Sequence, residues 1–415
     1  MDFLDELTWR GLIKDVTDLE GLKERIKRPM TVYCGFDPTA DSLHIGHLQQ
    51  LLLLKRYQQQ GHHPIALIGG ATGMIGDPRP TTERSLQTLD EINQNIIGIS
   101  AQIRSILCNT DLPVTIVNNY DWLSKIDILT FLRDFGKHFN VNYMIAKDIV
   151  SSRLATGISF TEFTYTILQA ADWLHLYQNH QCEMQIGGSD QWGNLTSGSE
   201  LIRKVVGNHA KVFGVTSPLI TNSDGSKFGK SEGKNIWLDP QKTDAYQFYQ
   251  YWINVSDSDI IDFMKRLSFK SVDEIMSLSS SMENQAHLRL PQKALAEELT
   301  DLVFGKEGLM SALKITDVLF SGQFDQLSLS ELEVALAEAS RGEISQDTLL
   351  IDCLVLIGAA KSKREARDLI TGGSVLVNGM KMTDLDFIVK KENALHKSLT
   401  VIRKGKKYYF VIRHS

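Results

Sequence analysis

The sequence predicts an α/β protein that begins with a parallel sheet and its covering helices, continues with a helical region and ends with a small α+β module. Two patterns carry this prediction. A strand, a helix and a second strand follow one another between residues 30 and 68, and such a unit makes its two strands run parallel. A second strand, loop and helix follow near residue 183. With 415 residues, the chain is long enough for two to four domains.

The first unit is read from residue types. Met30–Phe36 (MTVYCGF) is rich in the β-branched and aromatic residues of strands, and Asp37-Pro38 is a turn signal. A helix is predicted over Leu43–Gln60, ended by Gly61. The apolar segment Pro64–Ile68 is the next strand.

The second unit follows a long helical stretch. Helical patterns fill most of residues 84–180, and a strand is then predicted at Glu183–Ile186, before the glycine-containing loop GGSDQWG. The helix after this loop runs through Leu201–Val205, and Val212–Ile220 is one more strand. From 221 to 320 the periodicity is mostly helical.

These elements predict four segments. Residues 1–220 form the sheet domain and residues 221–322 a helical domain. Residues 323–346 are acidic and poor in aromatic side chains, which predicts a linker that contains a helix. Residues 347–415 form a separate α+β module.

Composition restricts the class of protein. The chain is 42% hydrophobic and 23% charged, and its longest apolar runs are too short to span a membrane. The first residues lack the basic region of a signal peptide. The four cysteines include no CxxC pair, which argues against a zinc or redox centre and predicts a reducing, cytoplasmic location.

Charge is unevenly distributed along the chain. The net charge is −6, yet residues 347–415 carry 13 Lys and Arg against 7 Asp and Glu, so the first 346 residues carry −12. An acidic body with a basic tail suggests that the tail meets a polyanion; a solvated basic surface is the alternative.

The predicted helix after the first strand opens with His44-Ile45-Gly46-His47. Its two histidines share one face at the carboxyl end of a strand and the start of a helix, where backbone N–H groups favour phosphate. Gly46 leaves room for a flat base against the backbone. The alternative is a metal-binding histidine pair, but no third ligand is spaced nearby.

A second motif, KFGKS, spans Lys227–Ser231. Its lysines, Lys227 and Lys230, are three residues apart in a glycine-containing loop, which suits a pyrophosphate leaving group. A Walker A loop is excluded because Asp224 stands where its first glycine would be. Alone, KFGKS is typical of a solvated basic loop; together with the upstream HIGH segment it indicates chemistry on ATP.

HIGH together with a KMSKS-like KFGKS resembles the class I aminoacyl-tRNA synthetases, and the surrounding sequence resembles the bacterial tyrosyl-tRNA synthetases. The likeness extends over essentially the whole chain, tail included. The matching stretches are YCGFDPTADSLHIGHL (Tyr33–Leu48), GGATGMIGDP (Gly69–Pro78), FLRDFGKHFNVNYM (Phe131–Met144), GISFTEFTYTILQAAD (Gly157–Asp172), QIGGSDQWGN (Gln185–Asn194) and KFGKS.

This resemblance implies a Rossmann-like catalytic domain and a two-step reaction. Tyrosine is first activated with ATP to tyrosyl-adenylate, and pyrophosphate leaves with Mg²⁺ that ATP carried in. Tyrosine is then transferred to the 3′ end of tRNA(Tyr). The family further implies a homodimer and no structural metal.

One predicted helix carries a polar stripe. Tyr165, Gln169 and Asp172 are spaced i, i+4 and i+7, while most other positions of the helix are apolar or small. The stripe lines a cavity or, alternatively, faces water on an amphipathic helix. By resemblance, Asp172 and Tyr33 bind the phenol hydroxyl of tyrosine.

The resemblance also assigns the remaining site residues. Tyr165, Gln169 and Asp77 hold the ammonium group, and Gln185 belongs to the same tyrosine-binding set. One loop departs from the family, since relatives usually carry a lysine between Asp77 and Arg84, and here Arg79 is the candidate for that charge. ATP and the adenylate are assigned to Cys34, Gly35, Asp37, Thr39, Gly46, Arg84, Gly187, Gly188, Asp190 and Gln191, and catalysis to His44, His47, Lys227, Lys230 and Ser231.

The tail resembles a small RNA-binding module shared with a ribosomal small-subunit protein. A strand at Ser374–Val377 meets Asn378-Gly379, a strong hairpin signal. Such modules bind RNA mainly through phosphates and shape. The basic residues assigned to RNA binding lie within two turns of a predicted helix: Lys361, Lys363, Arg364 and Arg367.

Three other functions compete with this interpretation. A small-molecule nucleotidyltransferase would not need the basic tail. A catalytically inactive RNA-binding protein would not need intact HIGH and KFGKS motifs. A tryptophan-specific synthetase is the nearest enzyme alternative, and Tyr33 with Asp172 argues against it because both suit a phenol.

Overall fold

The computed structural model describes residues 1–78, 87–108, 111–225, 228–231, 233–405 and 408–415. The chain forms two compact units, each described by itself below. Unit 1 contains Met1–Thr243 and Tyr251–Val303, and unit 2 contains Asp244–Gln250 and Phe304–Ser415.

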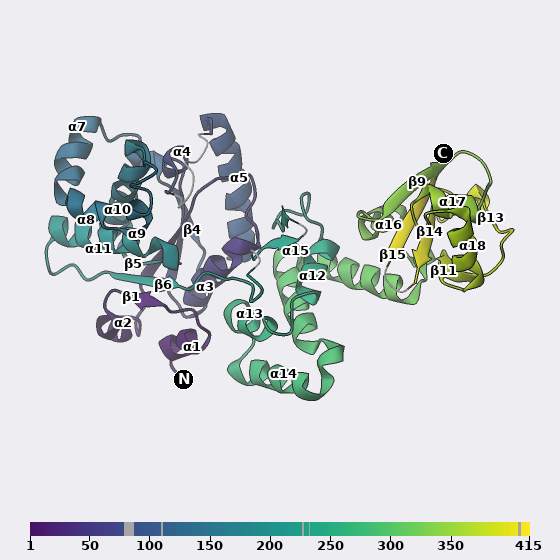
Figure 1. Ribbon diagram of the computed structural model, residues 1–415. Helices are drawn as coiled ribbons and strands as arrows, with labels where there is room; N and C mark the ends of the chain where they lie inside the picture. The colour runs from purple at the N-terminus through teal and green to yellow at the C-terminus, as the bar shows by residue number, and fades with distance from the viewer. Residues whose placement is uncertain (79–86, 109–110, 226–227, 232, 406–407) are drawn as a thin grey trace. The chain divides into compact units, whose positions relative to one another are not determined.

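Unit 1 is built on a six-stranded sheet in the order β1-β6-β5-β2-β3-β4. Figure 1 labels β1, β4, β5 and β6 of this sheet. β1 runs antiparallel to β6, and the other neighbours are parallel, as predicted. The chain runs outward from β2 to β3 and β4, then returns to β5 on the other side of β2. Strand order therefore reverses between β2 and β5, where open α/β sheets bind ligands. The strands are β1 (Asp15–Val16), β2 (Thr31–Phe36), β3 (His63–Ile68), β4 (Thr115–Asn118), β5 (Cys182–Gly188) and β6 (Phe213–Ser217).

Helices cover this sheet because successive strand side chains point to opposite faces. Helices α10 (Phe160–His180) and α11 (Trp192–Val206) pack on each other and against β5. Their apolar residues, including Trp173, share one buried cluster with Tyr33 of β2. Helix α3 (Leu48–Gln59) packs against β2, β3 and β5.

Two details of this region differ from the sequence prediction. Strand β4 lies inside 84–180, where helices were expected; it is a short, half-exposed edge strand. The helix predicted over Leu43–Gln60 is divided into a 3₁₀ turn, η1 (Ile45–His47), and α3. The turn is tighter because the His44 side chain accepts the backbone N–H of Gly46. The other helices before residue 225 are α1 (Phe3–Trp9), α2 (Leu19–Arg25), α4 (Thr72–Ile75), α5 (Leu89–Ile106), α6 (Tyr120–Leu123), α7 (Ile128–Thr130), α8 (Val141–Ile145) and α9 (Asp148–Ser151).

A buried arginine joins the helices after residue 251 to the sheet region. The guanidinium of Arg10, 1% exposed, donates to the carbonyl oxygens of Lys265 at 3.0 Å, Ser268 at 3.1 Å and Lys270 at 2.6 Å. These carbonyls lie at the end of α13 and after it, so the helical part of unit 1 is fixed to the N-terminal helix. The helices wholly within this part are α13 (Ile260–Leu267) and α14 (Val272–Gln285). Helices α12 (Ala245–Ile253) and α15 (Leu290–Ser321), the second interrupted at Gly305, each have residues in both units.

Unit 2 contains a five-stranded sheet in the order β12-β11-β14-β15-β9. The predicted hairpin is present: β11 pairs with β12 through Asn378 and Gly379, both with positive φ. The elements are β9 (Ser340–Ile344), β11 (Val375–Val377), β12 (Met380–Met382), β14 (Leu399–Lys404), β15 (Tyr408–His414), the small pair β10 (Thr348–Leu349) and β13 (Ile388–Val389), and helices α16 (Leu329–Ala335), α17 (Leu350–Leu356) and α18 (Lys363–Thr371).

Residues 323–346, expected to be a linker, are instead packed into unit 2. Phe324 and Leu332 are buried in one cluster with Val318, Leu399 and Val411. Strand β9 pairs in parallel with β15. The acidic composition misled the prediction because the charges lie on the outside while the apolar residues between them point inward.

No helix in the described part of the chain combines the length and apolarity needed to cross a membrane.

Candidate active site

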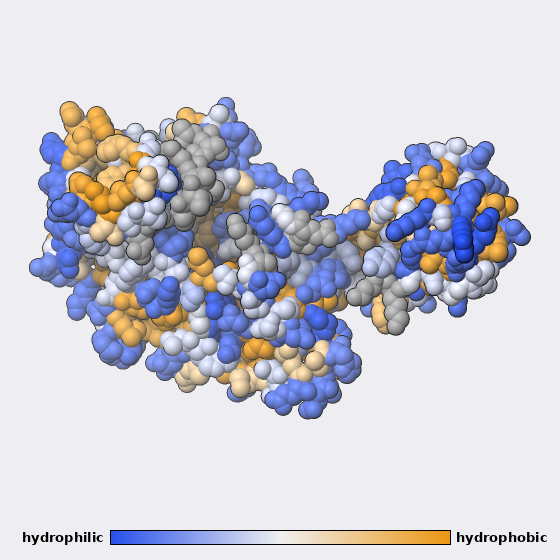
Figure 2. Space-filling view, viewed as in Figure 1, coloured by the Kyte–Doolittle hydropathy of each residue, from blue (hydrophilic) through white to orange (hydrophobic). Residues whose placement is uncertain are grey.

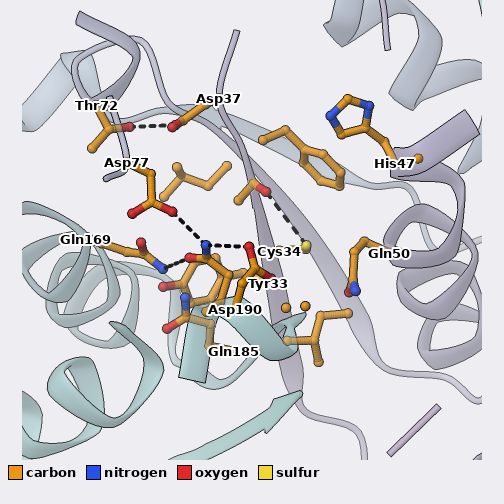
Figure 3. A pocket seen from close by; sticks show the side chains of 18 of the residues that line it. Tyr33, Cys34, Asp37, His47, Gln50, Thr72, Asp77, Gln169, Gln185 and Asp190 are labelled. Carbon is orange, nitrogen blue, oxygen red and sulfur yellow. Dashed lines mark hydrogen bonds between the residues drawn. The ribbon is translucent and has the colours of Figure 1, made fainter. Parts of the chain in front are cut away.

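A cavity of about 400 Å³ opens at the carboxyl ends of β2 and β5, at the reversal of strand order (Figure 3). Residues from β2, η1, α3, α10, β5 and the 3₁₀ turn η4 (Ser189–Gln191) contribute to its wall. Seventeen sequence-assigned residues line it: Tyr33, Cys34, Gly35, Asp37, Thr39, His44, Gly46, His47, Asp77, Tyr165, Gln169, Asp172, Gln185, Gly187, Gly188, Asp190 and Gln191.

The HIGH segment holds both histidine rings by backbone hydrogen bonds. Nδ1 of His44 accepts the N–H of Gly46 at 3.0 Å, and Nδ1 of His47 accepts the N–H of His44 at 3.2 Å. Because each Nδ1 is an acceptor, a neutral ring carries its proton on Nε2. Both histidines can therefore present an Nε2–H donor to a ligand.

The surroundings keep these rings neutral. Burial, together with the neighbouring His44, lowers the pKa of His47 to about 3. Burial also lowers the pKa of His44, and the charge of Lys230 adds to the effect. The pair then acts by hydrogen bonding, not by positive charge.

Glycine is required within HIGH for a reason that the sequence did not supply. A Cβ at Gly46 would lie 2.7 Å from the His44 ring. The prediction for Gly46 was room for a base; its structural role is to let the His44 ring fold back onto the turn. Gly35 is different, because a Cβ there would meet nothing within 4 Å, so the strand backbone is open to a ligand.

The polar stripe of α10 faces the cavity, as one of the two sequence alternatives predicted. Tyr165 and Asp172 are 5% and 2% exposed, so the stripe does not lie in bulk water. The hydroxyl of Tyr165 donates to Asp37 at 3.0 Å, and Nε2 of Gln169 donates to Gln191 at 3.2 Å.

Asp172 is held by two donors from outside its helix. Nδ2 of Asn119 donates to its Oδ2 at 2.9 Å, and Nε1 of Trp122 to its Oδ1 at 2.8 Å. Burial raises the pKa of Asp172 to about 7, although both of these hydrogen bonds lower it.

Five buried oxygens on the cavity wall lack a hydrogen-bond partner among the described residues. They are Tyr33 Oη and the Oε1 atoms of Gln49, Gln50, Gln169 and Gln185. Tyr33 and Gln185 are 1% and 3% exposed. Leaving such atoms unpaired costs free energy, so their gathering in one cavity indicates a polar ligand.

Two carboxylates next to Tyr165 and Gln169 belong to the same hydrogen-bond network (Figure 3). Nε2 of Gln191 donates to Asp77 at 2.7 Å, and Thr72 donates its hydroxyl to Asp37 at 3.0 Å. Two carboxylates and the unpaired amide oxygens give this part of the cavity a negative character, which suits an ammonium group.

The KFGKS segment lies beside HIGH, although only part of it is described. Lys230 and Ser231 form β7, which pairs with β8 (Lys234–Asn235). Lys230 lies close enough to His44 for its charge to lower the pKa of that ring. The described residues do not include Lys227. They also do not include Arg79 and Arg84, which belong to the loop that differs from the family pattern, and the side chain of Ser231 is not described.

Several functional residues were missed by sequence reasoning. Asn119 and Trp122 hold Asp172 but lie some 50 residues before it, just after β4 and on α6. Gln49, Gln50 and Thr72 also line the cavity. Position Gln50, three residues after His47, shares its helix face with the HIGH segment, and this spacing could have identified it.

In unit 2, the four residues assigned to RNA binding are solvent-exposed. Three lie on α18, whose N-cap is Ser362, and one lies just before it. Lys363 also pairs with Asp352 at 2.6 Å. Together, Lys361, Lys363, Arg364 and Arg367 place exposed positive charge at one end of this helix.

Comparison with known families gives two matches along the chain. Residues 24–321 match the model of class I tRNA synthetases specific for tryptophan and tyrosine. Residues 331–412 match the C-terminal domain of a type of tyrosine–tRNA ligase.

Similar proteins of established activity cover the full chain. A tyrosine–tRNA ligase of Bacillus cereus is 50% identical over 100% of both chains. That of Staphylococcus haemolyticus is 49% identical over 99% of both chains. Among solved structures, a C-terminally truncated mitochondrial tyrosyl-tRNA synthetase of Aspergillus nidulans is 29% identical, covers 77% of this chain and 94% of its own, and superposes with a TM-score of 0.68. A tryptophanyl-tRNA synthetase of Plasmodium falciparum, 16% identical with a TM-score of 0.53, shares the fold alone; it covers 80% of this chain and 87% of its own.

Proposed function

The chain belongs to the bacterial class I tyrosyl-tRNA synthetases and joins tyrosine to tRNA(Tyr) with ATP, and we propose that the cavity between β2 and β5 holds the reacting groups. One observation supports this most directly. Five buried oxygens without partners among the described residues line the same cavity as Asp172, and those on Tyr33, Gln169 and Gln185 belong to residues assigned to tyrosine. A tyrosine molecule offers hydroxyl and ammonium donors to such acceptors.

The phenol hydroxyl of the substrate is assigned to Asp172 and Tyr33. Asp172 accepts a hydrogen bond from this hydroxyl, and the hydroxyl of Tyr33 is its second hydrogen-bond partner. Phenylalanine would leave both groups buried and unpaired, which costs free energy. Tyr165, Gln169, Asp77 and Gln185 form the ammonium end, where the neighbouring carboxylates supply the negative charge.

ATP is assigned to the ends of β2 and β5. Its phosphates meet the Nε2–H groups of His44 and His47 and the lysines Lys227 and Lys230, with Ser231 beside them. The histidines donate without charge, so they stabilise the transition state by directed hydrogen bonds and the lysines do so by charge. The adenylate set is Cys34, Gly35, Asp37, Thr39, Gly46, Arg84, Gly187, Gly188, Asp190 and Gln191.

The reaction needs no protein nucleophile. A carboxylate oxygen of tyrosine attacks the α-phosphorus of ATP, the bond to the β-phosphate oxygen breaks, and pyrophosphate leaves. The terminal ribose hydroxyl of tRNA(Tyr) then attacks the carbonyl carbon of the adenylate, and AMP leaves. Mg²⁺ enters with ATP and leaves with pyrophosphate. The protein acts by positioning and charge stabilisation.

The tyrosine site is tested by Gln169→Leu, which keeps the side-chain volume and removes the unpaired oxygen. We expect tyrosine, measured by calorimetry without ATP, to bind about tenfold more weakly, the equivalent of one hydrogen bond to a charged group. Gln60→Leu, an exposed position at the end of α3, is the control. Equal affinity in both variants contradicts the assignment.

The tail is assigned to tRNA. Its exposed residues Lys361, Lys363, Arg364 and Arg367 supply phosphate contacts, and the excess of positive charge in 347–415 extends the attraction. We place the reaction in the cytoplasm.

A homodimer is proposed from an exposed apolar surface in unit 1. Figure 2 shows hydrophobic residues gathered at the upper left, where Figure 1 labels α7 and α8. Such a patch marks an interface, and a second copy of the chain is its occupant. The exposed large hydrophobic side chains between residues 128 and 160 are Ile128, Leu129, Leu132, Val141, Tyr143, Leu154 and Phe160. Leu129→Asp, at a side chain 74% exposed, should give monomers in analytical ultracentrifugation; a variant that sediments as a dimer argues against this interface.

A further inference from the structure

Gly229, the central residue of KFGKS, is bonded on both sides of its backbone. Its N–H donates to the hydroxyl of Tyr251 at 3.2 Å, and its carbonyl accepts the N–H of Ile236 at 3.0 Å. The φ of Gly229 is +87°, a conformation that favours glycine. The two peptide groups that flank Gly229, the second of which leads into Lys230, are therefore each held by one partner.

One of these partners, Ile236, also forms a backbone hydrogen bond with the HIGH segment. The carbonyl of Ile236 accepts the N–H of Ile45 at 3.0 Å, and the N–H of Leu238 donates to the carbonyl of Leu43 at 2.8 Å. A Cβ on Gly229 would lie 3.2 Å from the Ile45 side chain. The backbone of KFGKS thus passes directly over the segment that carries the two histidines.

The other partner is anchored by aromatic packing. The ring of Phe228 contacts Tyr251, with centroids 6.4 Å apart, and packs edge-on against Phe263 at 5.1 Å. Tyr251 itself lies near the end of α12 and packs edge-on against Trp252. The hydroxyl that accepts the Gly229 N–H consequently belongs to a ring that lies on a helix and packs against two other aromatic rings.

We propose that Tyr251 is a positioning residue of tyrosine activation: its hydroxyl orients the Gly229 peptide and thereby directs Lys230 toward the phosphates of ATP. The proposal rests on the proposed role of Lys230 at those phosphates. Tyr251 does not line the substrate cavity, so it acts through the backbone of the motif. A correctly aimed ammonium group matters most when charge develops on the leaving pyrophosphate, so the effect belongs to the chemical step.

The alternative role of this hydroxyl is purely structural, and Tyr251→Phe separates the two. The substitution removes one oxygen and keeps the ring contacts. We expect the kcat of ATP–pyrophosphate exchange to fall about three- to tenfold, the equivalent of one neutral hydrogen bond, with the KM for tyrosine unchanged. Transfer of tyrosine from preformed adenylate to tRNA should keep its rate, because pyrophosphate has already left.

Tyr57→Phe is the matched control. Its hydroxyl, on α3, is buried and has no hydrogen-bond partner among the described residues. All rates are normalised to the burst of adenylate formation, which counts folded sites, so a partly unfolded variant still gives a valid rate. A Tyr251→Phe enzyme with the parent kcat, or one whose only change is in the KM for tyrosine, overturns the proposal.

A double-mutant cycle with Lys230→Ala locates the effect. If Tyr251 acts through Lys230, Tyr251→Phe slows exchange in the parent and adds nothing further once Lys230 is alanine. Equal slowing in both backgrounds overturns the inference, because the hydroxyl would then act elsewhere. A Lys230→Ala enzyme with the parent rate contradicts instead the role proposed for Lys230 itself.

Discussion

Trp122 donates its indole N–H to Oδ1 of Asp172 across 2.8 Å, and this bond fixes the carboxylate before any substrate arrives. Asn119 holds the other oxygen in the same way. The Trp122 ring also stacks on His175, with centroids 4.2 Å apart. The phenol hydroxyl that we assign to Asp172 would therefore meet a pre-oriented acceptor, which would reduce the entropy lost on binding.

This arrangement predicts the specificity of two variants. Asp172→Asn or Tyr33→Phe should narrow the preference for tyrosine over phenylalanine by about 1–3 kcal/mol, the cost of one unpaired buried partner. Pyrophosphate exchange with each amino acid measures the preference as a ratio of kcat/KM. Full discrimination in either variant would show that the pocket is misassigned.

Asp172 should also make the unfolding free energy depend on pH. Burial raises its pKa to about 7 from the ordinary 3.8, so between these values the folded chain holds a proton that the unfolded chain has released. Stability is therefore lost as the pH rises through this window. An asparagine side chain cannot titrate, so Asp172→Asn should lose less stability than the parent between about pH 5 and about pH 8. Urea unfolding at both pH values measures the two losses, and equal losses would contradict the prediction.

The HIGH and KFGKS groups should affect rate more than binding. His44→Ala or Lys230→Ala is expected to slow adenylate formation by roughly 10²–10³, because their interactions strengthen as charge moves onto the phosphates. Tyrosine affinity, measured without ATP, should barely change. A large loss of affinity with an unchanged rate of activation would reverse the roles assigned here.

The tail should serve tRNA and not activation. A chain ended near Phe320 would keep HIGH, KFGKS and the cavity, and should still form adenylate while charging of tRNA collapses. Substitution of exposed residues is a better test than truncation, because the truncation would expose Val318, which is buried in the unit 2 core.

Replacing Lys361, Arg364 and Arg367 by glutamine leaves that core intact. We expect pyrophosphate exchange to be unchanged and the salt dependence of tRNA binding to become shallower, by about one in its slope for each phosphate that is no longer neutralised. Exchanging the exposed Lys306, Lys391 and Lys397 of unit 2 for glutamine removes the same three charges elsewhere and controls for net charge. A triple variant that charges tRNA like the parent would exclude this helix as an RNA-binding element.

Much of unit 1 could be predicted because its signals are local. The parallel strands, the HIGH turn and the stripe of α10 each depend on residues close together in sequence. Strand β4 escaped prediction because it is only four residues long and half-exposed, so it shows neither alternation nor a long apolar run.

The site residues that the sequence analysis missed were missed for one reason: they lie far from Asp172 in the sequence. Asn119 and Trp122 are unremarkable in the sequence, and only the pairing of β3 with β4 brings them to Asp172. Tyr251 contacts Gly229 because of the way α12 packs, and no pattern of residue spacing in the sequence predicts this contact. Residues 323–346 show the converse error, since their composition suggested a linker and their apolar residues fill a core.

The position of β15 in its sheet bears on how the chain is made. Translation proceeds from the N-terminus, yet Tyr408–His414 lies between β14 and β9, the strand at Ser340–Ile344. β9 can pair with β15 only after about 70 further residues have been synthesised. At about 5–20 residues per second, this synthesis takes several seconds. A product that stops before residue 408 would carry a complete cavity for tyrosine and ATP but an unclosed tail sheet with β9 unpaired. Such a fragment would consume ATP without delivering its product to tRNA, and its open strand edges would mark it for aggregation or degradation.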